Sequence, residues 1–280
     1  MPEFRHTDTV RWESTTVPGQ HRVPVRIYHP DSKNYGWLVW AHGGSWRAGS
    51  AADWHQACAA LALAASCTLV SVDYRLAPRH RHPAALADVI AALEWAQTQA
   101  ACENPHTPVA VGGDSAGGTL AACAALAWRD QQRPLAAQVL AYPPLDPQCQ
   151  APSYTRTPDS FPTRAWMIAA WQDYLAQIPP GTASGLYSTP LHAEDLTGMA
   201  PAILAVGKLD PVSDDVRLYA RRLRADGNHV ELRVFPELQH GAFLHPNNSD
   251  ATSGQPQASP LHRWLGTTLR HHLLAITSHR

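Results

Sequence analysis

Short runs of apolar, β-branched and aromatic residues alternate along this chain with longer stretches rich in alanine and leucine. The short runs are typical of buried strands and the longer stretches of helices. The predicted strands are Val23–Tyr28, Trp37–Ala41, Thr68–Asp73, Val109–Gly112, Ala137–Ala141, Ala202–Val206 and Val230–Phe235. The predicted helices are Trp54–Ser66, Pro83–Gln99, Ala116–Trp128, Asp214–Ala225 and Leu261–Ile276. This order indicates an α/β fold with a mostly parallel central sheet flanked by helices.

One segment, at about residues 145–200, interrupts the alternation with frequent prolines and no clear strand. Within it, Phe161–Ile178 places Trp166, Trp171 and several aliphatic residues on one helical face. A core helix and a lid over a substrate pocket both fit this pattern, and we favour the lid because the segment directly follows a strand. We therefore predict a single domain over residues 1–280, with a small cap inserted in it.

The composition is typical of a globular domain and gives no sign of binding to a polyanion. Hydrophobic residues make up 45% and charged residues 16%, which argues against disorder, and the net charge of −1 gives no reason to expect binding to nucleic acid. The sequence has neither an apolar run long enough to cross a membrane nor a recognisable secretory signal. We therefore expect no stable membrane association.

The cysteines point to a reducing environment. They number five, an odd count, and show no CxxC or similar spacing. Cys58, Cys67 and Cys123 lie among alanines and leucines, as small buried hydrophobic residues do. We expect a cytoplasmic protein, and a homodimer is left open.

Candidate chemistry begins at Gly113-Asp114-Ser115-Ala116-Gly117, which fits the pattern G-x-S-x-G. An apolar strand leads into it and an alanine-rich helix leads out. Such a sharp strand-to-helix turn exposes the serine hydroxyl, and the flanking glycines relieve crowding. A glycine-rich turn with an incidental serine is the alternative, but the context favours Ser115 as a nucleophile.

A serine hydroxyl needs a base, and the base needs an orienting acid. In this fold the chain order is serine, acid, histidine. Among the histidines after Ser115, His240 follows the strand Val230–Phe235 and precedes the last helix, whereas His245 is a neighbour without a following glycine. Asp210 follows the strand Ala202–Val206. We predict a catalytic triad of Ser115, Asp210 and His240.

A second glycine-rich loop, HGGSW at 42–46, follows the strand Trp37–Ala41. Backbone N–H groups in such a loop can point at a carbonyl oxygen as it gains charge, and the N–H of Ala116 supplies a further donor. By itself, the His-Gly-Gly sequence could belong to any tight turn.

Taken together, HGGSW (42–46), DYRLAP (73–78), GDSAGG (113–118), DPVSDD (210–215) and HGAF (240–243) resemble the hormone-sensitive-lipase family of esterases. The resemblance covers nearly the whole chain. It implies an α/β-hydrolase core, serine carboxylesterase activity, a small-molecule ester substrate and no metal or organic cofactor. It also implies the triad Ser115, Asp210 and His240, and an oxyanion hole formed by Gly44, Ser45 and Ala116.

Two departures from the family pattern affect the expected substrate. Ser45 stands where the family has a third glycine, and its conformation and side chain could either alter the oxyanion donor or narrow the acyl site. The short segment before the first motif implies a reduced helical cap. The bulky residues Trp46, Tyr74, Trp166 and Trp171 are candidate substrate contacts. We expect short acyl chains, from acetyl to butyryl, to be preferred.

Two other functions remain as alternatives. An arylformamidase-type amidase carries HGGxW with a residue other than glycine at the fourth position, as Ser45 does here. A non-catalytic small-molecule receptor on the same scaffold lacks the catalytic histidine, whereas His240 is present. The motifs GDSAGG, DYRLAP and DPxxDD favour the esterase over both.

Overall fold

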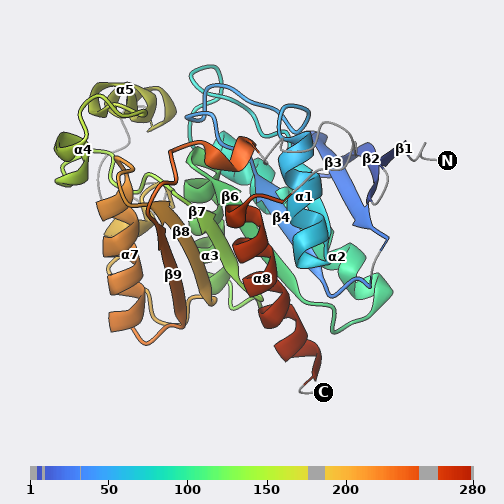
Figure 1. Cartoon of the computed structure of the whole chain (residues 1–280). Helices are drawn as coiled ribbons and strands as arrows, with labels where there is room; N and C mark the ends of the chain where they lie inside the picture. The colour runs from blue at the N-terminus through green and yellow to red at the C-terminus, as the bar shows by residue number, and fades with distance from the viewer. Residues whose placement is uncertain (1–4, 8–9, 32, 176–186, 246–257, 279–280) are drawn as a thin grey trace.

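The computed structural model describes residues 5–7, 10–31, 33–175, 187–245 and 258–278. Their strands form one nine-stranded sheet in the order β1-β2-β3-β5-β4-β6-β7-β8-β9 (Figure 1). The strands are β1 (Arg5–Thr7), β2 (Val10–Val17), β3 (Val23–Pro30), β4 (Trp37–Ala41), β5 (Thr68–Val72), β6 (Val109–Asp114), β7 (Gln138–Ala141), β8 (Ala202–Gly207) and β9 (Val230–Phe235).

The sheet is antiparallel at one side and parallel from β5 onward. Strands β1, β2, β3 and β5 pair antiparallel, and every later pair is parallel. All residues of β4, β5, β6, β7 and β8 are buried, as expected for parallel strands covered on both faces. Continuous apolar runs such as Trp37–Ala41 therefore form the centre of the fold.

The helices cover the two faces according to the direction of each crossover. The chain passes from β4 through α1 (His55–Ala65) to β5 in one direction along the sheet. It passes through α2 (Ala84–Glu103), α3 (Ala116–Asp130) and α7 (Ser213–Ala225) in the other. Right-handed crossovers therefore place α1 on one face and the other three helices opposite. The last helix, α8 (Pro260–Ser278), packs beside α1 (Figure 1).

Close contact between α8 and α1 depends on a glycine. A Cβ at Gly266 would lie 2.5 Å from the Cβ of Ala64, so the two helices approach more closely there than any larger residue allows. Leu261, Leu265, Leu269 and Leu273 form the buried stripe of α8. None of the described helices is long and apolar enough to span a lipid bilayer.

The predicted mostly parallel sheet flanked by helices is confirmed, and all seven predicted strands are present. The sequence prediction missed β1 and β2. Strand β2 contains Glu13, Ser14, Thr15 and Thr16 in sequence, and most of its residues are partly exposed. Its eight residues pair in register with those of β3. A polar strand near the edge of a sheet gives little hydrophobic signal, which explains the omission.

The segment predicted as a cap contains α4 (Ser153–Arg156), α5 (Arg164–Leu175) and a 3₁₀ turn, η1 (Pro190–His192), with no strand in its described part. Helices α4 and α5 lie beyond the carboxyl ends of the strands (Figure 1). The final residues of the predicted lid helix, 176–178, fall outside the described residues.

The cap segment is fastened to the start of α7 by two adjacent carboxylates. Asp215 accepts hydrogen bonds from the Leu145 and Asp146 amides and from the Tyr154 hydroxyl, at 2.9–3.2 Å. Asp214 accepts from the Ser153 amide and pairs with Arg156 at 2.7 Å. Both acids lie in the first helical turn, as the sequence indicates, and they also hold the neighbouring segment in place.

Candidate active site

Ser115 occupies a tight turn between β6 and α3. Its backbone has φ 50° and ψ −123°, a conformation rare for a residue with a side chain. A Cβ at Gly113 would lie 2.3 Å from the Gly117 carbonyl carbon, and one at Gly117 would lie 2.0 Å from the Ala41 carbonyl oxygen. Close backbone contacts therefore require glycine at both positions of the motif. Without side chains there, the backbone can adopt this tight turn.

Ser115, His240 and Asp210 form one hydrogen-bonded chain. The Ser115 Oγ lies 2.8 Å from His240 Nε2, and His240 Nδ1 lies 3.0 Å from both carboxylate oxygens of Asp210. Nδ1 therefore donates to Asp210, which leaves Nε2 free to accept the serine proton. The side chains of His240 and Asp210 are nearly inaccessible to water, at 3% and 0% exposure.

The loops after β8 and β9 bring the acid and the histidine together. A Cβ at Gly207, the last residue of β8, would lie 1.9 Å from the Leu238 carbonyl oxygen. Only glycine permits this approach of the two loops. Asp210 is oriented by its own turn, because Oδ1 accepts from the Val212 amide at 3.0 Å. Both residues thus lie at the carboxyl edge of the sheet, beside Ser115.

Asp114, next to the serine, braces the loop after β4. One carboxylate oxygen accepts from the indole N–H groups of Trp54 and Trp40, at 2.9 and 3.3 Å, and from the Gly43 amide at 3.1 Å. Burial raises the pKa of Asp114 to about 7, although these three donors act in the opposite direction. The sequence prediction used Asp114 only as part of the motif and missed this bracing role, which depends on contacts far apart in the chain.

The predicted oxyanion-hole residues lie in two places, the loop after β4 and the start of α3. Gly44 has φ +110° and Ser45 has φ +55°, and the Gly44 carbonyl accepts from the Arg47 and Ala48 amides. Ala116 is the first residue of α3. Within the described part of the chain, the N–H groups of Gly44, Ser45 and Ala116 donate to no protein acceptor. Backbone N–H groups without a protein acceptor are what the predicted oxyanion hole requires.

Three of the four predicted substrate contacts are deeply buried. Trp46 is inaccessible and stacks on Tyr174 at 4.6 Å between ring centroids, with Trp171 4.3 Å away. Tyr74 is 3% exposed, and its hydroxyl donates to the His42 carbonyl at 2.7 Å. These side chains hold the cap and the glycine-rich loop together.

Trp166 is the exception, with 47% of its surface exposed. Its indole N–H donates to the Ser45 Oγ at 3.1 Å, and the Arg47 guanidinium lies over its ring at 4.6 Å. Arg47 also pairs with Asp173 of α5 at 3.2 Å. The glycine-rich loop and the cap helix are thus joined directly beside the predicted oxyanion hole.

Phe161 is a site residue that the sequence prediction placed only within the lid. It is 59% exposed, and its ring centroid lies 6.1 Å from that of His240 and 5.9 Å from that of Trp166. It also borders a cavity of about 470 Å³ that reaches Asp210 and His240. No spacing in the sequence places Phe161 beside the histidine.

The chain resembles known esterases throughout. A family model described as alpha/beta hydrolase fold matches residues 38–244. The carboxylic ester hydrolase LipN of Mycobacterium tuberculosis is 39% identical over 81% of this chain, and the match spans 62% of LipN. The carboxylesterase NlhH of the same species is 36% identical over 90% of this chain and 81% of its own length.

A solved structure gives the same result. A bacterial heroin esterase superposes with a TM-score of 0.83 at 32% identity, covering 95% of this chain and 85% of that one. The chain therefore belongs to the α/β-hydrolase fold family, within the hormone-sensitive-lipase group of carboxylic ester hydrolases.

Proposed function

We propose that this protein hydrolyses short-chain carboxylic esters through an acyl-enzyme intermediate on Ser115. The observation that carries the proposal is the continuous contact from Ser115 through His240 to Asp210. Two carboxylic ester hydrolases among the relatives support the reaction type.

Acylation begins when the Ser115 Oγ attacks the ester carbonyl and its proton passes to His240 Nε2. The carbonyl oxygen becomes an oxyanion, which accepts hydrogen bonds from the amides of Gly44, Ser45 and Ala116. Losing one such donor typically costs about 3 kcal/mol of transition-state stabilisation. Asp210 stabilises the imidazolium. Collapse then breaks the bond to the alcohol, which leaves with the proton from His240.

Deacylation repeats these steps with water as the nucleophile. His240 takes a proton from the water as it attacks the acyl-enzyme carbonyl, and the same three amides stabilise the second oxyanion. Collapse releases the carboxylic acid and returns the proton to Ser115. No step requires a metal ion or an organic cofactor.

The preference for short acyl chains is supported by the contact between Ser45 and the cap. The Ser45 side chain lies next to a predicted oxyanion donor and accepts a hydrogen bond from Trp166. Each methylene that fits the acyl site contributes about 0.8 kcal/mol, whereas carbons beyond its capacity cause overpacking. A restricted acyl site of this kind favours acetyl to butyryl esters.

The base assignment is tested by replacing two nearby histidines. His240→Ala should abolish nearly all hydrolysis of p-nitrophenyl butyrate, because His240 is the base that contacts the Ser115 Oγ among the residues the structure describes. His245→Ala is the matched control, because His245 is exposed and follows the short turn η2 (Ala242–Leu244). If His245→Ala were the crippling change, the base assignment would be wrong.

The amidase alternative is retained because Ser45 occupies the position that separates the two groups. Turnover of p-nitrophenyl acetate and of N-formylkynurenine by the purified protein distinguishes them. The esterase proposal requires a much larger kcat/KM for the ester, and the reverse order would favour the arylformamidase.

We also propose a reducing, cytoplasmic setting. All five cysteines are unpaired, and four of them are buried. Burial raises the pKa of Cys67 and of Cys149 to about 12, which keeps both as unreactive thiols.

A further inference from the structure

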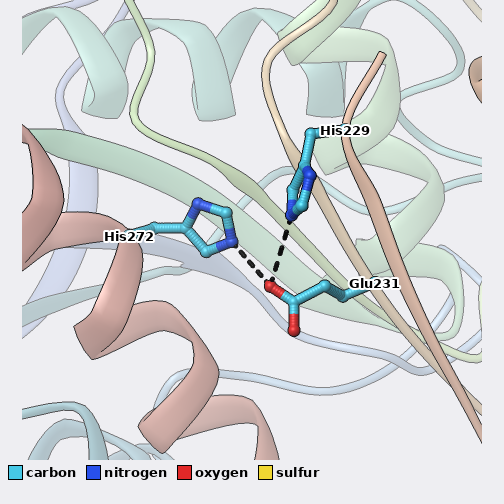
Figure 2. A group of neighbouring side chains, drawn as sticks. All are labelled: His229, Glu231 and His272. Atoms are coloured by element: carbon cyan, nitrogen blue, oxygen red, sulfur yellow. Dashed lines mark hydrogen bonds and ion pairs between the residues drawn. The ribbon is translucent and has the colours of Figure 1, made fainter. Parts of the chain in front are cut away.

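Three potential metal ligands meet at the amino end of β9, the opposite end of the strand from the predicted catalytic residues. His229 directly precedes β9, Glu231 is the second residue of β9, and His272 lies on α8. Figure 2 shows both imidazoles turning a ring nitrogen toward one carboxylate oxygen of Glu231. That oxygen lies 2.9 Å from His272 Nε2 and 3.6 Å from His229 Nε2. The three ligand atoms all lie within 4.8 Å of one another.

Hydrogen bonding accounts for only part of this arrangement. The 2.9 Å contact is a good hydrogen bond, but 3.6 Å is too long for one. Within the described residues, Glu231 forms no ion pair with arginine or lysine. Arg233, on the same face of β9, lies over the Phe235 ring at 4.7 Å. In the described part of the chain, the ion-pair partners of this carboxylate are therefore the two imidazoles.

The donor set and spacing suit a divalent transition metal. Imidazole nitrogen and carboxylate oxygen are the usual zinc ligands besides thiolate, at about 2.0–2.2 Å. Tetrahedral geometry then places neighbouring ligand atoms about 3.4 Å apart. The observed separations of 2.9 and 3.6 Å bracket this value. Small side-chain rotations would complete three ligands, and water would supply the fourth.

We propose that His229, Glu231 and His272 form a Zn²⁺ site that joins β9 to α8. The site is separate from the catalytic centre, because β9 runs from His229 at one sheet edge toward His240 at the other. Six residues of strand span about 20 Å. At its carboxyl end, the edge strand β9 contacts α8 through Phe235 and Trp264, whose ring centroids lie 6.1 Å apart. The metal adds a second connection at the other end of the strand.

The experiment measures Zn²⁺ binding to the full-length chain after dialysis against EDTA, by isothermal titration calorimetry and by the change in Tm. We expect one equivalent of Zn²⁺ to bind and to raise the Tm, because a ligand that binds only the folded state stabilises it. His229→Ala and Glu231→Gln should each weaken this binding by more than the roughly 10–100-fold typical of losing an outer-sphere partner. His229 is largely exposed, so its replacement leaves the core intact.

His271→Ala is the matched control, because His271 is the exposed neighbour of His272 on the same helix. It should retain wild-type Zn²⁺ affinity. His272→Ala provides a third variant expected to lose the site. Equal Zn²⁺ binding and equal Tm shifts in the wild type and His229→Ala would overturn the proposal, as would a loss in His271→Ala as large as that in His229→Ala. Wild-type hydrolysis of p-nitrophenyl butyrate by each variant verifies that it is folded.

Discussion

At the scale of single residues, Ser115 combines a reactive hydroxyl with an unfavourable backbone. A side chain at φ 50° and ψ −123° carries strain of about 1–3 kcal/mol. Ser115→Gly should relieve that strain and stabilise the fold by about 1 kcal/mol relative to Ser115→Ala. Both variants should lose turnover. Urea unfolding of the two proteins measures the difference, and equal stability would show that the turn is unstrained.

Ser45 also has a side chain in the left-handed region, at φ 55°. Ser45→Gly removes this side chain and its hydrogen bond to Trp166 while keeping the backbone N–H. We expect the acyl-chain optimum to shift toward longer esters, with a modest change in rate. The measurement is kcat/KM for p-nitrophenyl esters from acetyl to decanoyl.

Ser45→Ala separates the two effects, because it keeps the Cβ and loses the hydrogen bond. An optimum that moves only in Ser45→Gly assigns the restriction to the Cβ. A wild-type optimum at decanoyl would contradict the restricted acyl site altogether.

Asp114 gives a pH dependence of stability with a defined sign. Burial raises its pKa from 3.8 to about 7 in the folded state. Between these values the folded chain holds a proton that the unfolded chain has released. Its stabilising contribution is therefore full below about pH 4 and lost as the pH rises through about 7.

Urea unfolding at pH 5 and pH 8 tests this effect against Asp114→Asn, which cannot ionise. The wild type should lose more stability than the variant over this interval. Asp215, whose pKa burial also raises to about 7, is present in both proteins and cancels in the comparison. Identical pH dependence in the two proteins would contradict the assignment.

At the scale of elements, α5 is held to the core by one face. Trp171 is 2% exposed and packs against Trp46, whereas Trp166 is half exposed. Trp171→Ala should cost about 3–5 kcal/mol of unfolding free energy, because it leaves a cavity. Trp166→Ala, the control, should cost much less. Chemical denaturation measures both, and similar losses would show that α5 does not pack as described.

The elements that the sequence predicts best are those buried on both faces. The strand Trp37–Ala41 is apolar throughout and was predicted with its observed bounds. Strand β2 was missed because its pairing partner, not its own hydrophobicity, makes it a strand. Predicted helix ends were less accurate, as in α2, which continues to Glu103, beyond the predicted Gln99.

In the candidate site, too, the residues that follow buried strands are the ones that the sequence predicts. Ser115, Asp210 and His240 were predicted because each follows a recognisable strand, and parallel strands end at a common edge. The burial of Trp46 and the position of Phe161 beside His240 were not predictable, because each depends on how the cap packs against the rest of the domain. Aromatic residues near a motif gave no indication of which would be buried and which exposed.

At the scale of the whole molecule, the two edges of the sheet carry different chemistry. The carboxyl edge carries Ser115, Asp210 and His240 beneath the cap, and the opposite edge carries the cluster of His229, Glu231 and His272. Strand β9 connects the two, with His240 beyond one end and His229 before the other. Because the proposed catalytic residues all lie at the carboxyl ends of the strands, EDTA treatment should leave the rate of p-nitrophenyl butyrate hydrolysis unchanged.

Ser115 is proposed as the nucleophile that forms the acyl-enzyme. The most direct measurement is labelling of the intact protein with a fluorophosphonate probe, followed by peptide mass spectrometry. We predict one probe per chain, attached to the peptide that contains Ser115, with no labelling of Ser115→Ala and slow labelling of His240→Ala. Stoichiometric labelling of another serine, or an unlabelled wild-type protein that still hydrolyses esters, would show that Ser115 is not the nucleophile.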